Sequence, residues 1–164
     1  MGALPGLCLA TALASAFVPG QQFTLAWVHS IEKVRWEEDY RVAVGPGPAE
    51  GDAAGSSGQG RARLVATQAR VRGSAAGMEP PPGAVLHGGW FAYAPQDRYP
   101  QELRLSRSEF VPDYELCVDK ATSASTGDAT SATAGPEAPD CRPLGHWLPS
   151  DGAVTTMKAC LAPR

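Results

Sequence analysis

The amino-acid sequence predicts an all-β fold, a single-domain antiparallel sandwich or small barrel with two long flexible hairpin loops. Apolar residues recur at every second position in several short segments, which is the period of a half-buried strand. Eighteen glycines and 15 prolines occur among the 164 residues, and they divide the chain into pieces of strand length. Short strands with regularly spaced turns and little helical periodicity are typical of sandwiches and small barrels.

The strand candidates are separated by turns that contain Gly or Pro. The first candidate is the apolar run from Leu7 to Ala12, which is preceded by Pro and Gly. Each candidate has the length of an ordinary strand. The others, in chain order, are Phe23–His29, Trp36–Val44, Arg63–Val71, Gly89–Tyr93, Glu102–Leu105, Tyr114–Val118 and Ala153–Leu161.

The apolar segment near the N-terminus has two interpretations. Leu4–Val18 is apolar enough for the core of a secretory signal, and Ala14–Ala16 has the small-x-small pattern of a cleavage site. However, no Lys or Arg precedes this segment, and cleavage after Ala16 would remove Cys8 and leave an odd number of cysteines. We therefore favour a retained first strand, with cleavage of residues 1–16 as the alternative.

Two stretches have too few large apolar residues to contribute to a core. Residues 45–60 and 121–140 are rich in Gly, Ala, Ser and Thr, a composition typical of flexible low-complexity loops. Each stretch lies between two strand candidates, so we interpret both as loop insertions at the tips of hairpins. The flanking segments are too short to fold separately, which predicts one β domain over residues 1–164.

The charge balance and the hydropathy of the chain exclude two classes of protein. With 14 basic and 17 acidic residues, the chain has a net charge of -3 at pH 7, which provides no cationic surface for a nucleic-acid backbone. No stretch reaches the ~20 apolar residues that a membrane-spanning helix needs. The sequence therefore predicts neither nucleic-acid binding nor a transmembrane span in this chain.

The four cysteines predict two disulfide bonds. An even number of cysteines in a small acidic chain suits an oxidising compartment, so we expect a periplasmic or otherwise extracytoplasmic protein. Cys117 and Cys141 flank the second loop insertion, and a bond between them would close the base of that hairpin. Cys8 and Cys160 then form the other bond, although the spacing alone leaves the connectivity open.

The first long hairpin has two polar residues on otherwise apolar faces. On its first strand the odd positions are apolar as far as His29, and on its second strand the even positions are apolar except for Glu38. Antiparallel neighbours share a core face, and pairing Trp27 with Tyr40 satisfies this condition. The same register places His29 opposite Glu38, either as a structural hydrogen bond or as part of a ligand site.

Nucleophilic or metal-dependent catalysis has little support in the sequence. Ser30 directly follows His29, and neighbouring residues of a strand point to opposite faces, which is poor geometry for proton transfer. The chain has no Gly-x-Ser-x-Gly motif. Cys141, His146 and Cys160 also lack the compact spacing of a zinc site. We therefore predict no catalytic residue, no metal and no cofactor.

A glycine-containing segment after Val71 is a candidate anion-binding loop. Gly73 and Gly77 permit a left-handed backbone, and successive amides in such a turn form a nest for an anion beside Arg72. A tight loop without a ligand is the alternative interpretation.

Several motifs together resemble a known family. In this order, the chain contains His-Ser-Ile-Glu-Lys from His29, Trp-Glu-Glu-Asp-Tyr-Arg-Val from Trp36, Gly-Ser-Ala-Ala-Gly-Met from Gly73, and Gly89-Trp90. These motifs resemble the domain of unknown function 1850 (DUF1850) family, and the resemblance covers most of the chain outside the two loop insertions. It implies a small bacterial protein of unassigned activity, with no established catalytic residues. It also implies a gene often found beside a TAXI-type tripartite ATP-independent periplasmic (TRAP) transporter.

We therefore expect a non-enzymatic extracytoplasmic module that is associated with such a transporter. It would bind TRAP transporter subunits or a small anionic solute. The alternative is a small enzyme or metal-binding protein that uses His29 and Glu38. An open pocket around these two side chains would favour the alternative, whereas packing beneath other side chains would favour the module.

Overall fold

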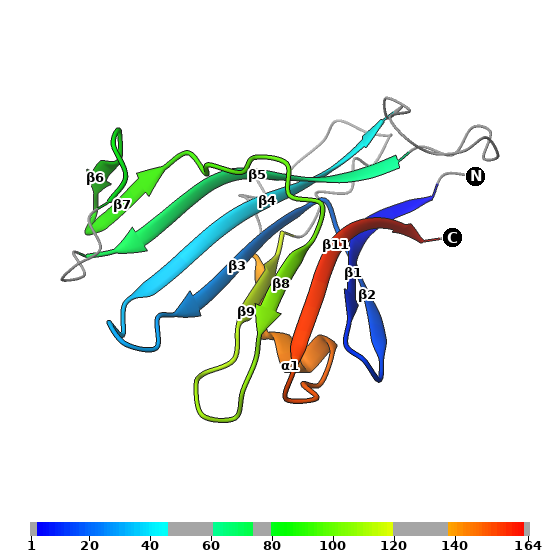
Figure 1. Cartoon of the computed structure of the whole chain (residues 1–164). Helices are drawn as coiled ribbons and strands as arrows, with labels where there is room; N and C mark the ends of the chain where they lie inside the picture. The colour runs from blue at the N-terminus through cyan, green and yellow to red at the C-terminus, as the bar shows by residue number, and fades with distance from the viewer. Residues whose placement is uncertain (1–2, 46–60, 74–79, 120–137, 163–164) are drawn as a thin grey trace, which may run out of the picture.

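The computed structural model describes residues 3–45, 61–73, 80–119 and 138–162 (Figure 1). Within these ranges the chain forms strands and one short helix, α1 (Leu144–Trp147). The strands are β1 (Leu4–Ala10), β2 (Ser15–Pro19), β3 (Gln22–Val28), β4 (Arg35–Gly45), β5 (Arg61–Arg72), β6 (Val85–His87), β7 (Trp90–Tyr93), β8 (Leu103–Ser106), β9 (Glu115–Val118), β10 (Asp140–Pro143) and β11 (Val154–Ala162).

The strands form two open antiparallel sheets. The four-stranded sheet has the order β2-β1-β11-β8, and the seven-stranded sheet has the order β10-β9-β3-β4-β5-β7-β6. The two sheets face each other across one hydrophobic core (Figure 1). This arrangement confirms the predicted all-β fold and identifies it as a sandwich.

The core is built from alternate residues of strands in both sheets. Because successive side chains of a strand point to opposite faces, one apolar residue in every two reaches the space between the sheets. The four-stranded sheet contributes Leu7, Leu9, Val18, Leu105 and Met157, and the seven-stranded sheet contributes Phe23, Leu25, Tyr40, Val42, Leu64, Ala66 and Leu116.

The apolar segment near the N-terminus is a central strand in this structure. β1 lies between β2 and β11, and the side chains of Leu7 and Leu9 are 0% exposed. The segment thus forms a strand, as predicted, whereas cleavage of residues 1–16 stays a separate prediction. Ala16, part of the pattern that resembles a cleavage site, lies in β2 opposite Leu9.

The two predicted loop insertions connect antiparallel neighbours, as hairpin loops require. The first joins β4 to β5, and the second joins β9 to β10. Residues 46–60 and 120–137 lie outside the described residues. Asp140, which we assigned to the second insertion, is the first residue of β10 instead.

Four elements were not predicted, and three of them are very short. β6 has three residues, while β10 and α1 have four each, so none is long enough to show a hydrophobic period. β2 was missed because its residues belong to the apolar run that also resembles a secretory signal.

Both disulfide bonds of the structure have the predicted partners. Cys8 is bonded to Cys160, which joins β1 to β11, and Cys117 is bonded to Cys141, which joins β9 to β10. No helix among the described residues has the length and apolar character needed to cross a membrane.

We expect loss of the Cys8–Cys160 bond to destabilise the fold more than loss of the Cys117–Cys141 bond. The bonded residues are 152 positions apart in the first case and 24 in the second. Loop-closure entropy alone gives about 5 and about 3.5 kcal/mol for loops of these lengths. Urea unfolding of the paired Cys→Ala variants measures both losses. A larger loss for the Cys117/Cys141 variant would contradict this order.

Candidate functional site

The predicted pairing of His29 with Glu38 is wrong, because the β3–β4 hairpin has a different register. Trp27 lies opposite Trp36, a slip of four residues from the predicted register. Glu38 therefore lies opposite Leu25 on β3, and His29 lies in the turn beyond the last strand pair.

The alternation of apolar residues does not distinguish the predicted register from the observed one. A slip by an even number of residues leaves every side chain on the same face of its strand. The observed register brings Trp27 against Trp36, with stacked rings whose centroids are 6.2 Å apart. It also closes the turn, since the His29 amide donates to the Val34 carbonyl at 2.9 Å. These are contacts that the sequence pattern could not rank.

His29 acts as a turn residue in this structure. Its Nδ1 accepts a hydrogen bond from the Glu32 amide at 3.3 Å, and its carbonyl accepts one from the Lys33 amide at 2.9 Å. Lys33 has a φ of 57°, in the left-handed region that residues other than glycine seldom adopt. The His29 side chain therefore helps to close a tight turn.

Glu38 lies with two tyrosines on the inner face of the seven-stranded sheet. The Tyr40 hydroxyl donates a hydrogen bond to its carboxylate. Burial raises the pKa of Tyr40, and the hydrogen bond to Glu38 raises it further. Burial and the charge of Glu38 also raise the pKa of Tyr93. The carboxylate is thus held by a neutral phenol, which is a structural contact.

A network of ion pairs covers part of the outer face of the same sheet. Arg70 on β5 contacts Glu37 at 2.7 Å and Asp39 at 2.6 Å. Arg35 contacts Glu37 at 2.7 Å and Glu115 on β9 at 2.6 Å. Sequence reasoning missed this network, although the odd positions of β4 are charged from Arg35 to Arg41. Its partners on β5 and β9 could not be chosen without the strand order.

A shallow pocket lies beside this network. Its volume is about 340 Å³, and β3, β4 and β5 supply most of its lining. It adjoins Thr67, which has no partner in the β4–β5 register. An irregularity of this kind bends a strand locally. The charged residues of its lining are Asp39, Arg41, Arg70 and Asp119. Because two guanidinium groups balance two carboxylates, the charge of the lining favours neither an anionic nor a cationic ligand.

The predicted anion-binding loop is partly contradicted. Gly73 has a φ of 75°, but its amide donates to the Gly89 carbonyl at 2.8 Å. The Arg72 guanidinium lies 5.6 Å from the centroid of the Trp90 ring. Gly77 lies outside the described residues. The Gly73 amide closes the loop between β5 and β7 and is therefore not free to bind an anion.

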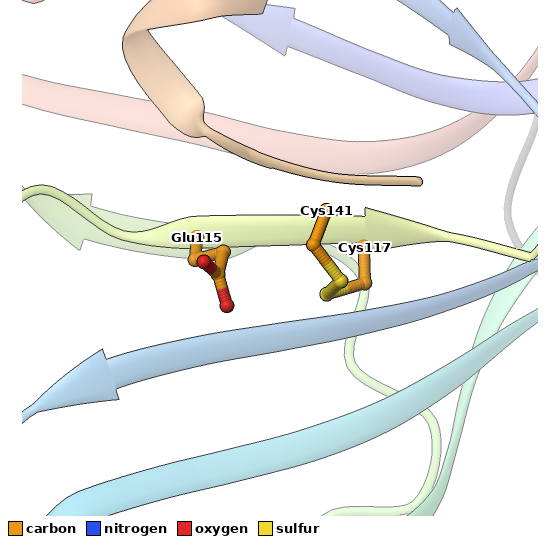
Figure 2. Close-up of side chains that lie close together, drawn as sticks. All are labelled: Glu115, Cys117 and Cys141. Carbon is orange, nitrogen blue, oxygen red and sulfur yellow. A yellow bond between two sulfur atoms is a disulfide. The ribbon is translucent and has the colours of Figure 1, made fainter. Parts of the chain in front are cut away.

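Three groups that are able to bind a metal lie together on β9 and β10. The ligand atoms of Glu115, Cys117 and Cys141 are all within 4.8 Å of one another (Figure 2). The two sulfurs are bonded to each other, whereas metal ligation requires thiolates. Glu115 also accepts a hydrogen bond from Arg35. In the disulfide form, these groups staple an edge hairpin.

An ion pair between a buried arginine and a partly exposed aspartate, also missed by sequence reasoning, holds the connection from β8 to β9. The Arg107 side chain is 2% exposed, and it donates two hydrogen bonds of 2.8 Å to the Asp113 carboxylate. It also donates to the Leu148 carbonyl and the Thr155 hydroxyl. Asp113 accepts a further hydrogen bond from the Gly145 amide at 2.8 Å. This pair therefore joins the connection to α1 and β11.

The polar groups of the candidate site are engaged mainly with one another. Among the described residues, no hydroxyl or thiol forms a hydrogen bond with a histidine, which is the contact that activates a nucleophile in many hydrolases. The alternative function, a small enzyme, depended on a pairing of His29 with Glu38. The observed register separates these two residues.

Comparison with known proteins identifies the family. The model of a domain of unknown function, DUF1850, matches residues 23–124, so the chain belongs to that family, as its motifs predicted. The match includes β3 to β9, while β1, β2, β10 and β11 lie outside it. No curated protein and no solved structure matches the chain.

We expect the Asp113→Asn substitution to destabilise the fold by about 3 kcal/mol, because it leaves the buried Arg107 without its counter-charge. The pKa of Asp113 combines opposing effects: burial raises it, but the hydrogen bonds from Arg107 and Gly145 hold it below its ordinary value. Since the folded-state pKa is the lower one, this stability is present above about pH 4 and is lost as the pH falls further.

Urea unfolding at several pH values tests this expectation. The wild-type protein should lose stability below about pH 4 more steeply than Asp113→Asn. Glu102→Gln is the control, because the Glu102–Arg104 pair is exposed and such pairs contribute about 0–1 kcal/mol. Equal losses for the two variants would contradict a structural role for the Arg107–Asp113 pair.

A double-mutant cycle should show that His29 and Glu38 act independently. Glu38 is three residues along β4 from the Val28–Arg35 pair that precedes the turn, or about 10 Å at the strand rise. His29→Ala and Glu38→Gln should therefore be additive within about 0.5 kcal/mol. Tyr40→Phe should instead couple to Glu38→Gln by about 1 kcal/mol, because it removes a shared hydrogen bond. The reverse pattern in urea unfolding would favour the predicted register.

Proposed function

We propose that the protein is a non-enzymatic extracytoplasmic accessory module of a TAXI-type TRAP transporter, and that it binds a subunit of that transporter. Membership of the DUF1850 family supports the association, because genes of this family often lie beside genes for such a transporter.

The pair of disulfide bonds is the observation that carries this proposal. Cys8–Cys160 joins strands from the two ends of the described chain, and Cys117–Cys141 joins an edge hairpin. Disulfide bonds persist in the periplasm and other oxidising compartments and are rare in the cytosol. All four cysteines are bonded, which suits a protein that works outside the cytoplasm beside the extracytoplasmic parts of a transporter.

The use of the polar groups supports a binding role without chemistry. Glu38 is held by Tyr40, and the charged residues on β4 are held by Arg70 and by one another. Catalytic groups instead need a free proton donor, acceptor or nucleophile within reach of a substrate. A rigid, covalently stapled sandwich is a suitable scaffold for contacts made by its loops.

A macromolecular partner is favoured over a small anionic solute. The pocket beside the ion-pair network contains as many carboxylates as guanidinium groups. In the predicted anion-binding loop, the Gly73 amide already donates to the Gly89 carbonyl. These two places are therefore occupied or balanced in charge.

Co-expression with the transporter tests the proposal. We expect the tagged protein to be released with the periplasmic fraction, without free thiols, and to co-purify with a transporter subunit. We also expect deletion of its gene to reduce solute uptake by the transporter. A tagged periplasmic protein of similar size is the control for non-specific capture. Cytoplasmic location with reduced cysteines, or unchanged uptake together with no co-purification, would overturn the proposal.

A further inference from the structure

One end of the sandwich is formed by the connections that follow β1, β3 and β8. β1 and β8 are both antiparallel to β11, so they finish at the same end of their sheet. The Arg107–Asp113 pair closes the loop after β8, which places the start of β9 at this end. Because β3 is antiparallel to β9, the turn after β3 lies here as well. Figure 1 shows these connections along the lower side of the molecule.

Each of these three connections exposes a large apolar side chain. Leu13 is 85% exposed, Ile31 is 79% exposed and Phe110 is 87% exposed, more than any other large apolar residue that the structure describes. We call these three residues the apolar tips. A single exposed apolar residue is ordinary on a protein surface, but three on separate connections at the same end indicate an interaction surface.

The connections that carry the apolar tips are closed by hydrogen bonds. In the first, the Thr11 amide donates to the Ala14 carbonyl at 2.8 Å. In the second, the His29 amide closes the turn onto Val34, and the third is closed by the ion pair of the buried Arg107. Side chains on preorganised loops lose less conformational freedom when they bind. The tips are thus presented in fixed positions on the scaffold.

Carboxylates accompany all three apolar tips. Glu32 and Glu109 adjoin Ile31 and Phe110 in the sequence, and within the described residues neither carboxylate has an ion-pair partner. In the connection that carries Leu13, Asp151 accepts a hydrogen bond from the Ala12 amide at 3.2 Å. Lys33 adds a positive charge beside Glu32, so the three carboxylates leave this end of the sandwich with an excess of negative charge beside its apolar side chains.

The negative charge favours a protein over a lipid bilayer as the occupant. Insertion of the tips into a bilayer would bring their carboxylates toward the hydrocarbon region and toward anionic headgroups, and both effects are unfavourable. A protein surface with an apolar hollow edged by Lys or Arg would complement the apolar side chains and the carboxylates together. The apolar tips therefore suit a protein of this kind.

We infer that the apolar tips dock into a transporter subunit at an apolar hollow edged by lysine or arginine side chains. This inference rests on the proposed function and identifies the surface through which it is performed. The three tips are the apolar anchors of the contact, and the carboxylates beside them set its orientation.

Site-specific photocrosslinking tests the location of the contact. Leu13→p-benzoylphenylalanine, Ile31→p-benzoylphenylalanine and Phe110→p-benzoylphenylalanine are made singly in the full chain and co-expressed with the transporter. Tyr99→p-benzoylphenylalanine is the control, because Tyr99 is 63% exposed and lies beside the first residues of β5, at the opposite end. We expect all three tip positions to crosslink to the same transporter subunit and the control to give no product.

A triple variant measures the contribution of the tips. Leu13→Ser/Ile31→Ser/Phe110→Ser should melt at the wild-type temperature, because exposed side chains contribute little to folding. It should bind the isolated crosslinked subunit at least about tenfold more weakly than wild type, as expected for loss of interface anchors. Tyr99→Ser should bind like the wild-type protein. Vesicles of phosphatidylethanolamine and phosphatidylglycerol should not retain the wild-type protein in flotation.

Three outcomes would overturn the inference. Crosslinks from position 99 but not from the tips, with full binding by the triple variant, would leave the proposed function intact and place the contact elsewhere. Flotation with vesicles that depends on the tips would identify a lipid surface as the occupant. Failure of the wild-type protein to bind any transporter subunit would overturn the proposed function and this inference with it.

Discussion

Closure of the core by the pairing of β1 with β11 is the constraint on which the rest of the structure depends. The seven-stranded sheet turns Phe23, Leu25 and Leu116 toward the interior, and a single sheet cannot remove such side chains from water on its own. Leu9 and Met157, which lie opposite each other on β1 and β11, cover them from the other side. Because these strands come from distant parts of the chain, the Cys8–Cys160 bond holds together the most entropically costly contact of the fold.

This closure depends on strands that lie outside the family match. The DUF1850 match covers residues 23–124, which include most of the seven-stranded sheet but only β8 of the opposing sheet. β1, β2 and β11 lie outside the match and nevertheless supply Leu7, Leu9, Val18 and Met157 to the core. Two apolar tips, Ile31 and Phe110, lie inside the match, and Leu13 lies outside it.

The sequence predicted which face of each strand is buried, but not every strand pairing. The apolar alternation correctly placed Leu25 and Trp27 on the core face, since the period of two is a local property of a strand. The predicted partner of Trp27 was wrong. A slip of four residues preserves the alternation, so only cross-strand contacts decide between the two registers. Arg107 could not be predicted as a buried residue, since arginine is ordinarily exposed and its partners Leu148 and Thr155 are distant in sequence.

Charged groups of the sheets and side chains of the connections differ in how many of their possible contacts are made. Inside and across the sheets, most charges have a partner: Glu38 has Tyr40, Arg70 has two carboxylates, and Arg107 has Asp113. These contacts stabilise the folded state without the help of a ligand. At the end formed by the connections after β1, β3 and β8, the opposite holds, since large apolar side chains face water beside carboxylates that have no ion-pair partner. Burial of exposed apolar side chains in a complex lowers the free energy, whereas breaking a satisfied hydrogen bond or ion pair raises it. The contact proposed above therefore uses the loops, and the paired charges of the sheets stabilise the scaffold that carries them.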